Sequence, residues 1–222
     1  ANIVRNNNTI GVKMAAPIKF GVGQSVRRKE DDALIRGKGR YTDDVSPSPA
    51  LQALMLRSPH AHATFTIDAS KARSLPGVSL ILTAAEVGDL GDLPCQFNFD
   101  TDPFTVPPYP ILPKSEVRHV GDAVAFVVAD TIAQARDAIE AIEVEWTPLP
   151  AVAGVVNAVK ADAPQVWPDR KGNVAFEAEQ GDRAKTEKAF AKAARTVSLT
   201  VVNNRLASNY METRACIAEY DK

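Results

Sequence analysis

The chain has 222 residues, of which 45% are hydrophobic and 24% are charged, and its formal net charge is −1. This composition excludes a disordered or collagen-like chain, and the lack of a basic surplus argues against a nucleic-acid partner. The longest apolar stretches, such as residues 123–129, are far shorter than the roughly 20 residues that a membrane-spanning helix requires.

The two cysteines, Cys95 and Cys216, lie far apart in the sequence and form no CxxC pair. This spacing excludes a zinc ribbon, an iron–sulfur cluster held by this chain alone, and a dense disulfide framework. We therefore expect a cytoplasmic protein.

The N-terminal region is expected to contain little regular structure. Residues 1–19 include an Asn-rich stretch and no apolar signal-peptide core, which favours a disordered extension. Residues 20–36 are rich in turn formers and charges, which favours an extended segment laid over a surface.

Strands and short helices are expected to alternate from residue 51 onward. The apolar run 51–57 predicts a strand buried on both faces, and the alternation in 63–67 predicts a half-buried strand. Asp68 is expected to cap a helix over 70–74, and a strand over 78–82 follows. Thr83 with Glu86 then matches a capping box, which predicts another brief helix.

Residues 88–115 contain six of the chain's 15 prolines. A long loop of this kind costs ordering entropy without forming its own ladder, and such loops are usually functional. We expect this loop to form an interface.

A strand–helix–strand module is expected over residues 121–146. The strand 123–129 is followed by a helix that Asp130 or Thr131 caps, and a strand resumes at 144–146. The pattern is typical of two strands on one shared sheet. A linker is expected over 152–173.

The last third is expected to begin a second unit. Asp182 is expected to cap a helix that ends near residue 194, with a buried stripe formed by Ala189, Phe190 and Ala193. Strands are expected over 195–203 and 216–220. The unit reads as incomplete, because no covering helix follows.

Two glycine-rich stretches do not match nucleotide-binding motifs. Gly21 and Gly23 supply the first two glycines of a dinucleotide fingerprint, but Val26 stands where the third belongs. Residues 37–39 lack the spacing of a phosphate-binding P-loop, and a turn is expected there.

His60 and His62 would share one face of a strand, which suits either a metal ion or structural hydrogen bonds. No nearby Cys or acid pair completes a ligand set. Glu212 is the most informative acid, since Arg214 lies within reach. Glu212 is expected either to form a structural ion pair that locks a turn or to lie at the edge of a pocket.

Several stretches, which follow one another in the same order along the chain, resemble the molybdenum-binding large subunit of the xanthine oxidase family. The resemblance includes its carbon monoxide dehydrogenase and aldehyde oxidase-like branches. The resemblance covers about residues 20–221. It rests on residues 21–31, 37–44, 57–63, 75–78, 120–125 and 144–152.

The resemblance implies a mixed α/β (α+β) fold with an a/b hammerhead domain over 37–151, followed by the incomplete start of a molybdopterin-binding domain over 174–222. Residues 211–214 match an early marker of that second domain. The dehydrogenase-like form of the marker is Met-Glu-Pro-Arg, and Thr213 departs from it.

The resemblance also implies the chemistry of a parent enzyme. A molybdenum–molybdopterin centre would hydroxylate or oxidise a small molecule, water would supply the oxygen, and electrons would leave through 2Fe-2S clusters to FAD in partner subunits or domains. The family's cofactor contacts and catalytic glutamate match nothing here, so no catalytic, cofactor-binding or metal-binding residue is assigned. A stand-alone, non-catalytic binding or assembly subunit is the alternative.

Overall fold

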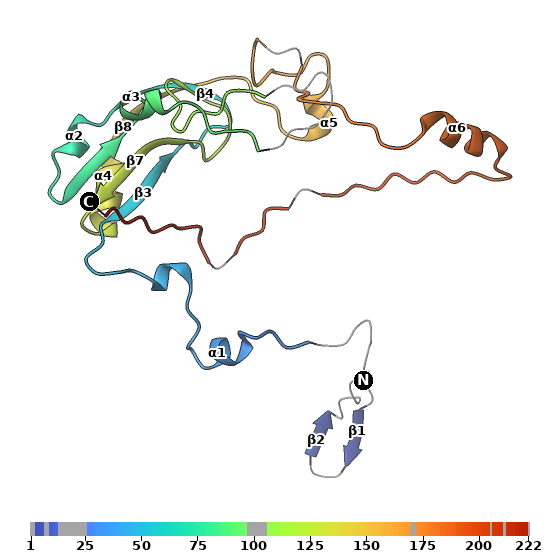
Figure 1. The fold of residues 1–222 in the computed structure, drawn as a ribbon, viewed down its shortest axis with the longest axis horizontal. Coiled ribbons are helices and arrows are strands. Elements are labelled where there is room, and N and C mark those ends of the chain that lie inside the picture. Colours follow the sequence, from blue (N-terminus) through green and yellow to red (C-terminus); the bar gives the residue numbers. More distant parts are fainter. Residues whose placement is uncertain are drawn as a thin grey trace. The chain divides into compact units, whose positions relative to one another are not determined.

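The structure is a computed structural model that describes residues 3–6, 9–12, 26–96, 106–169, 172–204, 206–210 and 212–221 (Figure 1). It is mixed α/β and divides into two compact units. The larger unit is Ser48–Asn204, and the smaller combines Ala1–Pro47 with Arg205–Lys222. The part of the chain that the structure describes contains no helix both long and apolar enough to cross a membrane.

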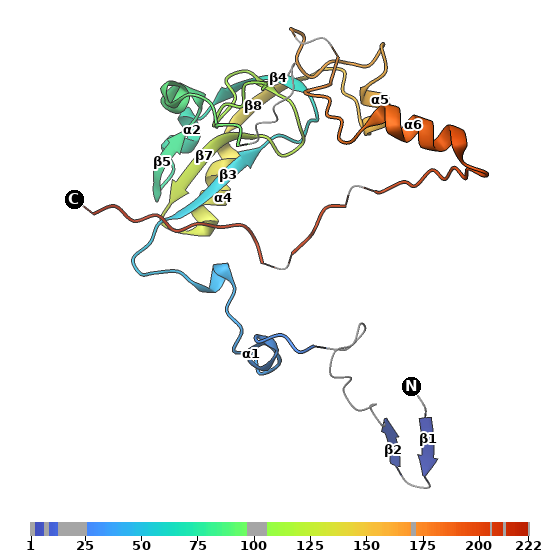
Figure 2. The ribbon, with the colours of Figure 1, turned by 45° about the vertical axis from the view of Figure 1, so that its right-hand side comes forward.

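The larger unit is built on two antiparallel three-stranded sheets (Figure 2). The first sheet has the order β3 (Gln52–Arg57), β7 (Ala123–Ala129), β5 (Val78–Leu82). The second has the order β6 (Glu116–Val117), β4 (Ala63–Asp68), β8 (Glu143–Pro148). The four strands expected between residues 51 and 129 are confirmed.

Strand β3 is buried on one face only, so the expectation of a strand buried on both faces was wrong. Its residues alternate between half-buried and exposed. Leu54 lies opposite Val127 of β7, whereas Met55 lies opposite Phe126 on the other face of the sheet. The alternation arises because one face of the sheet packs on helices, whereas the residues on the other face of β3 are exposed.

Strands β7 and β8 do not share a sheet, which corrects the expected strand–helix–strand module. Both edges of β7 are occupied, by β3 and β5, and β8 pairs with β4 instead. Helix α4 (Ile132–Ala141) therefore connects one sheet to the other. A central strand has no free backbone groups for a third neighbour, which explains the arrangement.

Side-chain caps mark the starts of three helices. The helix that begins at Ser70 has Ala69 at its N-cap position and no side-chain cap there, so the N-cap expected at Asp68 was wrong. Thr83 and Glu86 form the expected capping box at α3 (Ala84–Val87). Thr131 Oγ1 accepts the amide of Gln134 at α4, and Asp182 Oδ1 accepts the amide of Lys185. The remaining helices of the larger unit are α2 (Ser70–Arg73), η2 (Gly88–Leu90), α5 (Val155–Ala158) and α6 (Arg183–Lys192).

Two adjoining clusters form the core of the larger unit. One lies between the β3-β7-β5 sheet and helices α2 and α4, and its largest fully buried side chains are Ile81 and Val127. The other joins the sheets through Phe65, Val117 and Val124. Full burial of one such side chain contributes about 1.5–3 kcal/mol, so these few residues carry much of the stability.

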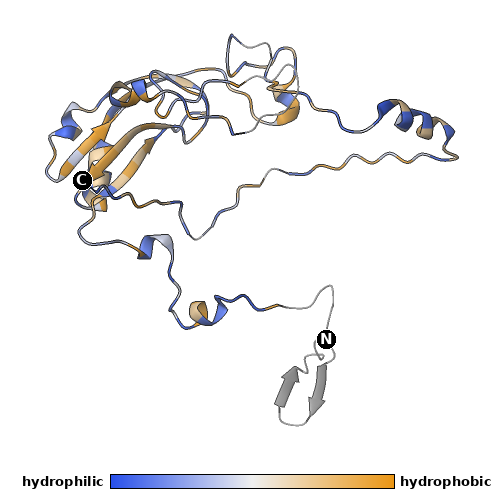
Figure 3. Cartoon of the chain, in the orientation of Figure 1, coloured by the Kyte–Doolittle hydropathy of each residue, from blue (hydrophilic) through white to orange (hydrophobic). Residues whose placement is uncertain are grey.

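The part from 174 to 204 contributes no buried residue. Helix α6 begins at its expected cap, but Phe190 is 61% exposed, so the expected buried stripe was wrong. No strand forms over 195–203, because no neighbouring strand pairs with it among the described residues. Figure 3 shows the apolar colouring concentrated on the strands of the two three-stranded sheets, while α6 is largely polar.

The smaller unit contains more regular structure than expected. Strands β1 (Ile3–Asn6) and β2 (Thr9–Val12) pair within the stretch that was expected to be disordered. Residue types with high strand propensity, such as Ile and Val, are common there. Helix α1 (Asp31–Ile35) interrupts the segment that was expected to be extended, and η1 (Thr42–Asp44) follows.

Two further expectations concern this unit. The strand expected over 216–220 is absent, since these residues have no ladder partner among the described strands. Gly21 and Gly23 lie outside the described residues.

Candidate functional site

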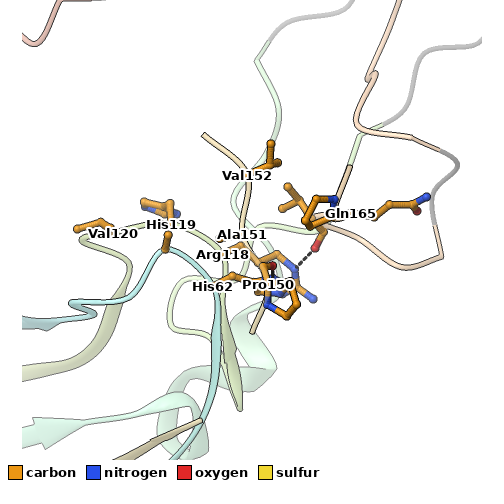
Figure 4. Close-up of a pocket in the computed structure, with 11 residues that line it drawn as sticks. His62, Arg118, His119, Val120, Pro150, Ala151, Val152 and Gln165 are labelled. Atoms are coloured by element: carbon orange, nitrogen blue, oxygen red, sulfur yellow. Dashed lines mark hydrogen bonds between the residues drawn. The ribbon is translucent and has the colours of Figure 1, made fainter. Parts of the chain in front are cut away.

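A small pocket of about 180 Å³ opens where the start of β4 meets the residues after β6 and after β8 (Figure 4). Its polar side chains are His62, Arg118, His119 and Gln165, and short apolar residues and prolines complete it. All of its residues belong to the larger unit. It is the candidate site of this unit because three cation-forming side chains meet there.

His62 occupies the inner side of the pocket and is held at both ring nitrogens. Nδ1 lies 2.9 Å from the carbonyl oxygen of Pro150, and Nε2 lies 2.8 Å from Glu116 Oε1. The side chain is only 10% exposed. A carbonyl and an ionised carboxylate both accept hydrogen bonds, so the ring satisfies both contacts as a donor only when both nitrogens carry a proton.

Arg118 extends this polar chain away from His62. Its Nη2 atom donates to Glu116 Oε2 at 2.9 Å, and its Nε atom donates to the carbonyl oxygen of Val166 at 3.0 Å. The guanidinium also lies 5.5 Å from the ring centroid of Trp167. Glu116 thus contacts both His62 and Arg118, and each carboxylate oxygen has its own partner.

His119 lies at the rim of the same pocket. It is half exposed, its Nδ1 atom lies 3.7 Å from Asp122 Oδ2, and its ring stacks on Tyr109 at 6.4 Å. His60 lies elsewhere and packs against Trp146 at a centroid distance of 5.5 Å. The two histidines that could have shared a metal ion therefore face different partners.

The chemistry that this pocket supports is hydrogen bonding and positioning. Among the described residues, no three His, Cys, Asp or Glu side chains are grouped so that they could hold a metal ion. The polar atoms of His62, Glu116 and Arg118 are instead directed at one another and at backbone carbonyls. We assign no residue of this chain to the molybdenum cofactor.

Glu212, the acid singled out from the sequence, lies in the smaller unit and binds Thr42. Its Oε1 atom accepts the amide of Thr42 at 2.8 Å and the hydroxyl at 2.5 Å. These bonds, from the hydroxyl first and then the amide, hold the pKa of Glu212 below its usual value. Beside it, Thr213 donates from its hydroxyl to Asp43 Oδ2 at 3.0 Å.

The expectation that Glu212 forms an ion pair with Arg214 was wrong. Across the described residues, Arg214 makes no hydrogen bond or ion pair, and Glu212 is exposed. The carboxylate acts instead as an N-terminal cap for the η1 turn, supplied from 170 residues further along the chain. A carboxylate in this position compensates backbone N–H groups that have no partner within the turn.

Glu212 also lines a shallow hollow of the smaller unit. The hollow is open to solvent and is lined by Arg40, Tyr41, Thr42, Val45, Glu212, Ala215, Cys216 and Ile217. The position at a pocket edge and the structural contact are therefore compatible descriptions of this residue.

The sequence reading missed Glu116 and Arg118. They stand two residues apart around Val117 of β6, a spacing that places both side chains on one face of a strand. That signal is weak, because β6 has only two residues and its pairing with β4 joins positions far apart in the sequence.

Two models of known protein families match the chain. The first is the a/b hammerhead domain of aldehyde oxidase and xanthine dehydrogenase, over residues 36–150. The second is the molybdopterin cofactor-binding domain, over residues 166–222. The first match alone covers more than half of the chain.

Curated relatives agree with these matches. The chain is 34% identical over 205 residues to the nicotine 6-hydroxylase large subunit of Paenarthrobacter nicotinovorans, covering 90% of this chain and 24% of that protein. It is 36% identical over 215 residues to the carbon monoxide dehydrogenase large chain of Afipia carboxidovorans, covering 91% and 26%. The chain thus spans about a quarter of the length of these relatives.

Solved structures show the same fold. Quinoline 2-oxidoreductase from Pseudomonas putida 86 matches with a TM-score of 0.59 and 38% identity, over 72% of this chain and 20% of that one. Aldehyde oxidoreductase from Desulfovibrio gigas matches with a TM-score of 0.61 and 30% identity, over 77% and 19%. The chain therefore belongs to the aldehyde oxidase and xanthine dehydrogenase family, and it aligns with part of the large subunits of its relatives.

Proposed function

We propose that this chain is the framing and subunit-docking part of a molybdenum-dependent oxidoreductase. The observation that carries the proposal is the presence of both family matches, 36–150 and 166–222, in one chain whose relatives are large subunits. The parent enzyme would hydroxylate or oxidise a small molecule at a molybdenum–molybdopterin centre, with water as the source of oxygen.

In this proposal the hammerhead domain covers 37–151, a linker covers 152–173, and the molybdopterin-binding domain begins at 174. The molybdenum cofactor is assigned to the part of the relatives' length that this chain does not span. Partner subunits or domains carry 2Fe-2S clusters and FAD, which take up the electrons. The small number of cysteines supports a cytoplasmic location, where dense disulfide frameworks are rare.

The loop 88–115 is the proposed docking surface for a partner. Its residues 97–105 lie outside the described part of the structure. Its described residues include a bridge between Asp92 and Pro110, and Leu112 is buried in the core. Leu90, Leu93 and Tyr109 expose large apolar surfaces beside that bridge, which is typical of a protein contact site.

Glu212 has a structural role in the proposal, as the cap of the η1 turn. Its contact with Thr42 joins the first residues of the 37–151 range to the marker at 211–214. Arg214 belongs to the same marker, and we assign it no separate role.

Elemental analysis tests the proposal. The native protein that carries this sequence is expected to contain molybdenum in a fixed ratio to the polypeptide and to purify with iron and flavin. The 222-residue chain alone is expected to contain no molybdenum and to show no hydroxylase activity. A native protein without molybdenum, or stoichiometric molybdenum on the isolated chain, would overturn the proposal.

A further inference from the structure

The segment between β8 and residue 173 has to satisfy its backbone with little regular structure of its own. Among its described residues, 150–169, 172 and 173, the only helix is α5, a single turn. Backbone N–H and C=O groups that leave water need partners, and ladders or helices normally supply them. Local turns supply some of these partners, such as the carbonyl of Lys160 for the amide of Ala163 at 3.1 Å, and side chains supply others.

Val166 is held at both of its backbone groups. Its amide donates to Asn173 Oδ1 at 3.0 Å, and its carbonyl accepts Arg118 Nε at 3.0 Å. Asn173 also donates from Nδ2 to the carbonyls of Ala158 and Pro164, at 2.9 and 3.0 Å. Asn173 thus bonds to three residues of the segment, and Arg118 bonds the segment to the sheet.

Arg118 is in turn fixed by the β4 and β6 strands. Glu116 binds its Nη2 atom at 2.9 Å, and His62 binds the other oxygen of Glu116 at 2.8 Å. His62 reaches the same segment at its beginning, through the carbonyl of Pro150. The network therefore touches the segment at both ends and is anchored on the hammerhead sheet between them.

We propose that Arg118 is a positioning residue that fixes 150–169 as a rigid arm rather than a flexible linker. Its planar guanidinium suits the task, because Nε and Nη2 donate in different directions while its face lies over Trp167. The match to the molybdopterin cofactor-binding model begins at residue 166, so Arg118 contacts its first residue. Only this consequence, the placing of that domain, rests on the proposed function.

Hydrogen exchange on the native protein tests the arm directly. Arg118→Gln is expected to speed exchange of the amides in 158–169 by roughly tenfold, because it removes a charge-assisted hydrogen bond. Asn173→Ala is expected to do the same, and the double variant is expected to add little, since both side chains hold Val166. Arg136→Gln is the matched control, because Arg136 is an exposed arginine on α4.

Amides of β7 report whether the fold is intact. Wild-type protection of 158–169 in Arg118→Gln, with β7 protected, would overturn the inference. If Arg118→Gln unfolds β7 as well, Arg118→Lys decides. Lysine keeps the charge, but a single ammonium nitrogen replaces the separate Nε and Nη2 donors of the planar guanidinium. Fast exchange of the arm in this variant supports the inference, and wild-type exchange refutes it. Absence of molybdenum from the native protein would refute the proposed function and leave this result unaffected.

Discussion

At the scale of single residues, two neighbours on one strand contribute unequally to the free energy of unfolding. Ile81 of β5 is 1% exposed in the helix-facing core, whereas Leu80 is 44% exposed on the other face. Ile81→Ala is expected to lower the free energy of unfolding by about 2–5 kcal/mol, through lost burial and a residual cavity. Leu80→Ala is expected to cost less than about 1.5 kcal/mol. Urea denaturation of the chain measures both, and equal losses would contradict this account of the core.

The contact between the carboxylate of Glu212 and Thr42 depends on pH. Because the pKa of Glu212 in the folded chain is lowered, the contact with Thr42 stabilises the fold above the unfolded pKa of about 4.5. This stabilisation is lost as the pH falls through the lowered folded value. The protection factor of the Thr42 amide is therefore expected to be constant near neutrality and to fall in acid.

Hydrogen exchange followed by NMR measures this effect, with Leu34 as the reference. The amide of Leu34 bonds to a backbone carbonyl, that of Glu30, and involves no carboxylate. Glu212→Ala is expected to remove the protection of Thr42 at every pH. A Thr42 protection factor that follows Leu34 throughout the titration would contradict the cap.

At the scale of elements, α4 depends on its N-cap. Thr131 Oγ1 accepts the amide of Gln134, and the helix it starts buries Ala135 and Ala138 against the β3-β7-β5 sheet. Thr131→Ala is expected to destabilise the chain by about 1 kcal/mol, the usual value of such a cap. Thr131→Ser keeps the hydroxyl and is expected to stay within a few tenths of a kcal/mol. Thermal unfolding compares the two, and equal melting temperatures would refute the role of the cap.

Elements whose signals are local could be predicted from the sequence. The caps at Thr83, Thr131 and Asp182 lie where expected, because a cap involves residues only two or three apart. Sheet membership could not be predicted, since the pairing of β8 with β4 depends on which edges are already occupied. The apolar alternation in 195–203 indicates a strand, but a strand needs a neighbour, and the described structure supplies none.

The candidate functional residues likewise include one that the sequence indicated and two that it did not. Glu212 stood out because an arginine lies two residues away, yet its partner Thr42 is distant in the sequence. Glu116 and Arg118 gave no comparable signal, because their partners His62 and Val166 come from other parts of the chain. Long-range pairing is a property of the fold, so the site became visible only in three dimensions.

At the scale of the whole molecule, the buried core is confined to one stretch of the chain. Every hydrophobic residue in the two core clusters lies between Leu54 and Trp146. By contrast, every described residue from 174 to 204 is exposed, including Val197 at 92% and Leu199 at 84%. Local stability follows buried contacts, so the two stretches should differ strongly in how often they open.

Limited proteolysis therefore makes a prediction about the assembled protein. In the isolated chain, subtilisin is expected to cut first within 174–204 and to leave a fragment that contains 52–148, because a protease needs an exposed, locally unfolded backbone. In the native protein, if its remaining length covers Val197 and Leu199 as the proposed function requires, cleavage there is expected to slow by at least tenfold, an effect that corresponds to about 1.4 kcal/mol. Mass spectrometry of the fragments locates the cuts. Equal cleavage rates at 174–204 in the two samples would mean that the apolar alternation of this stretch is not buried by the rest of the protein.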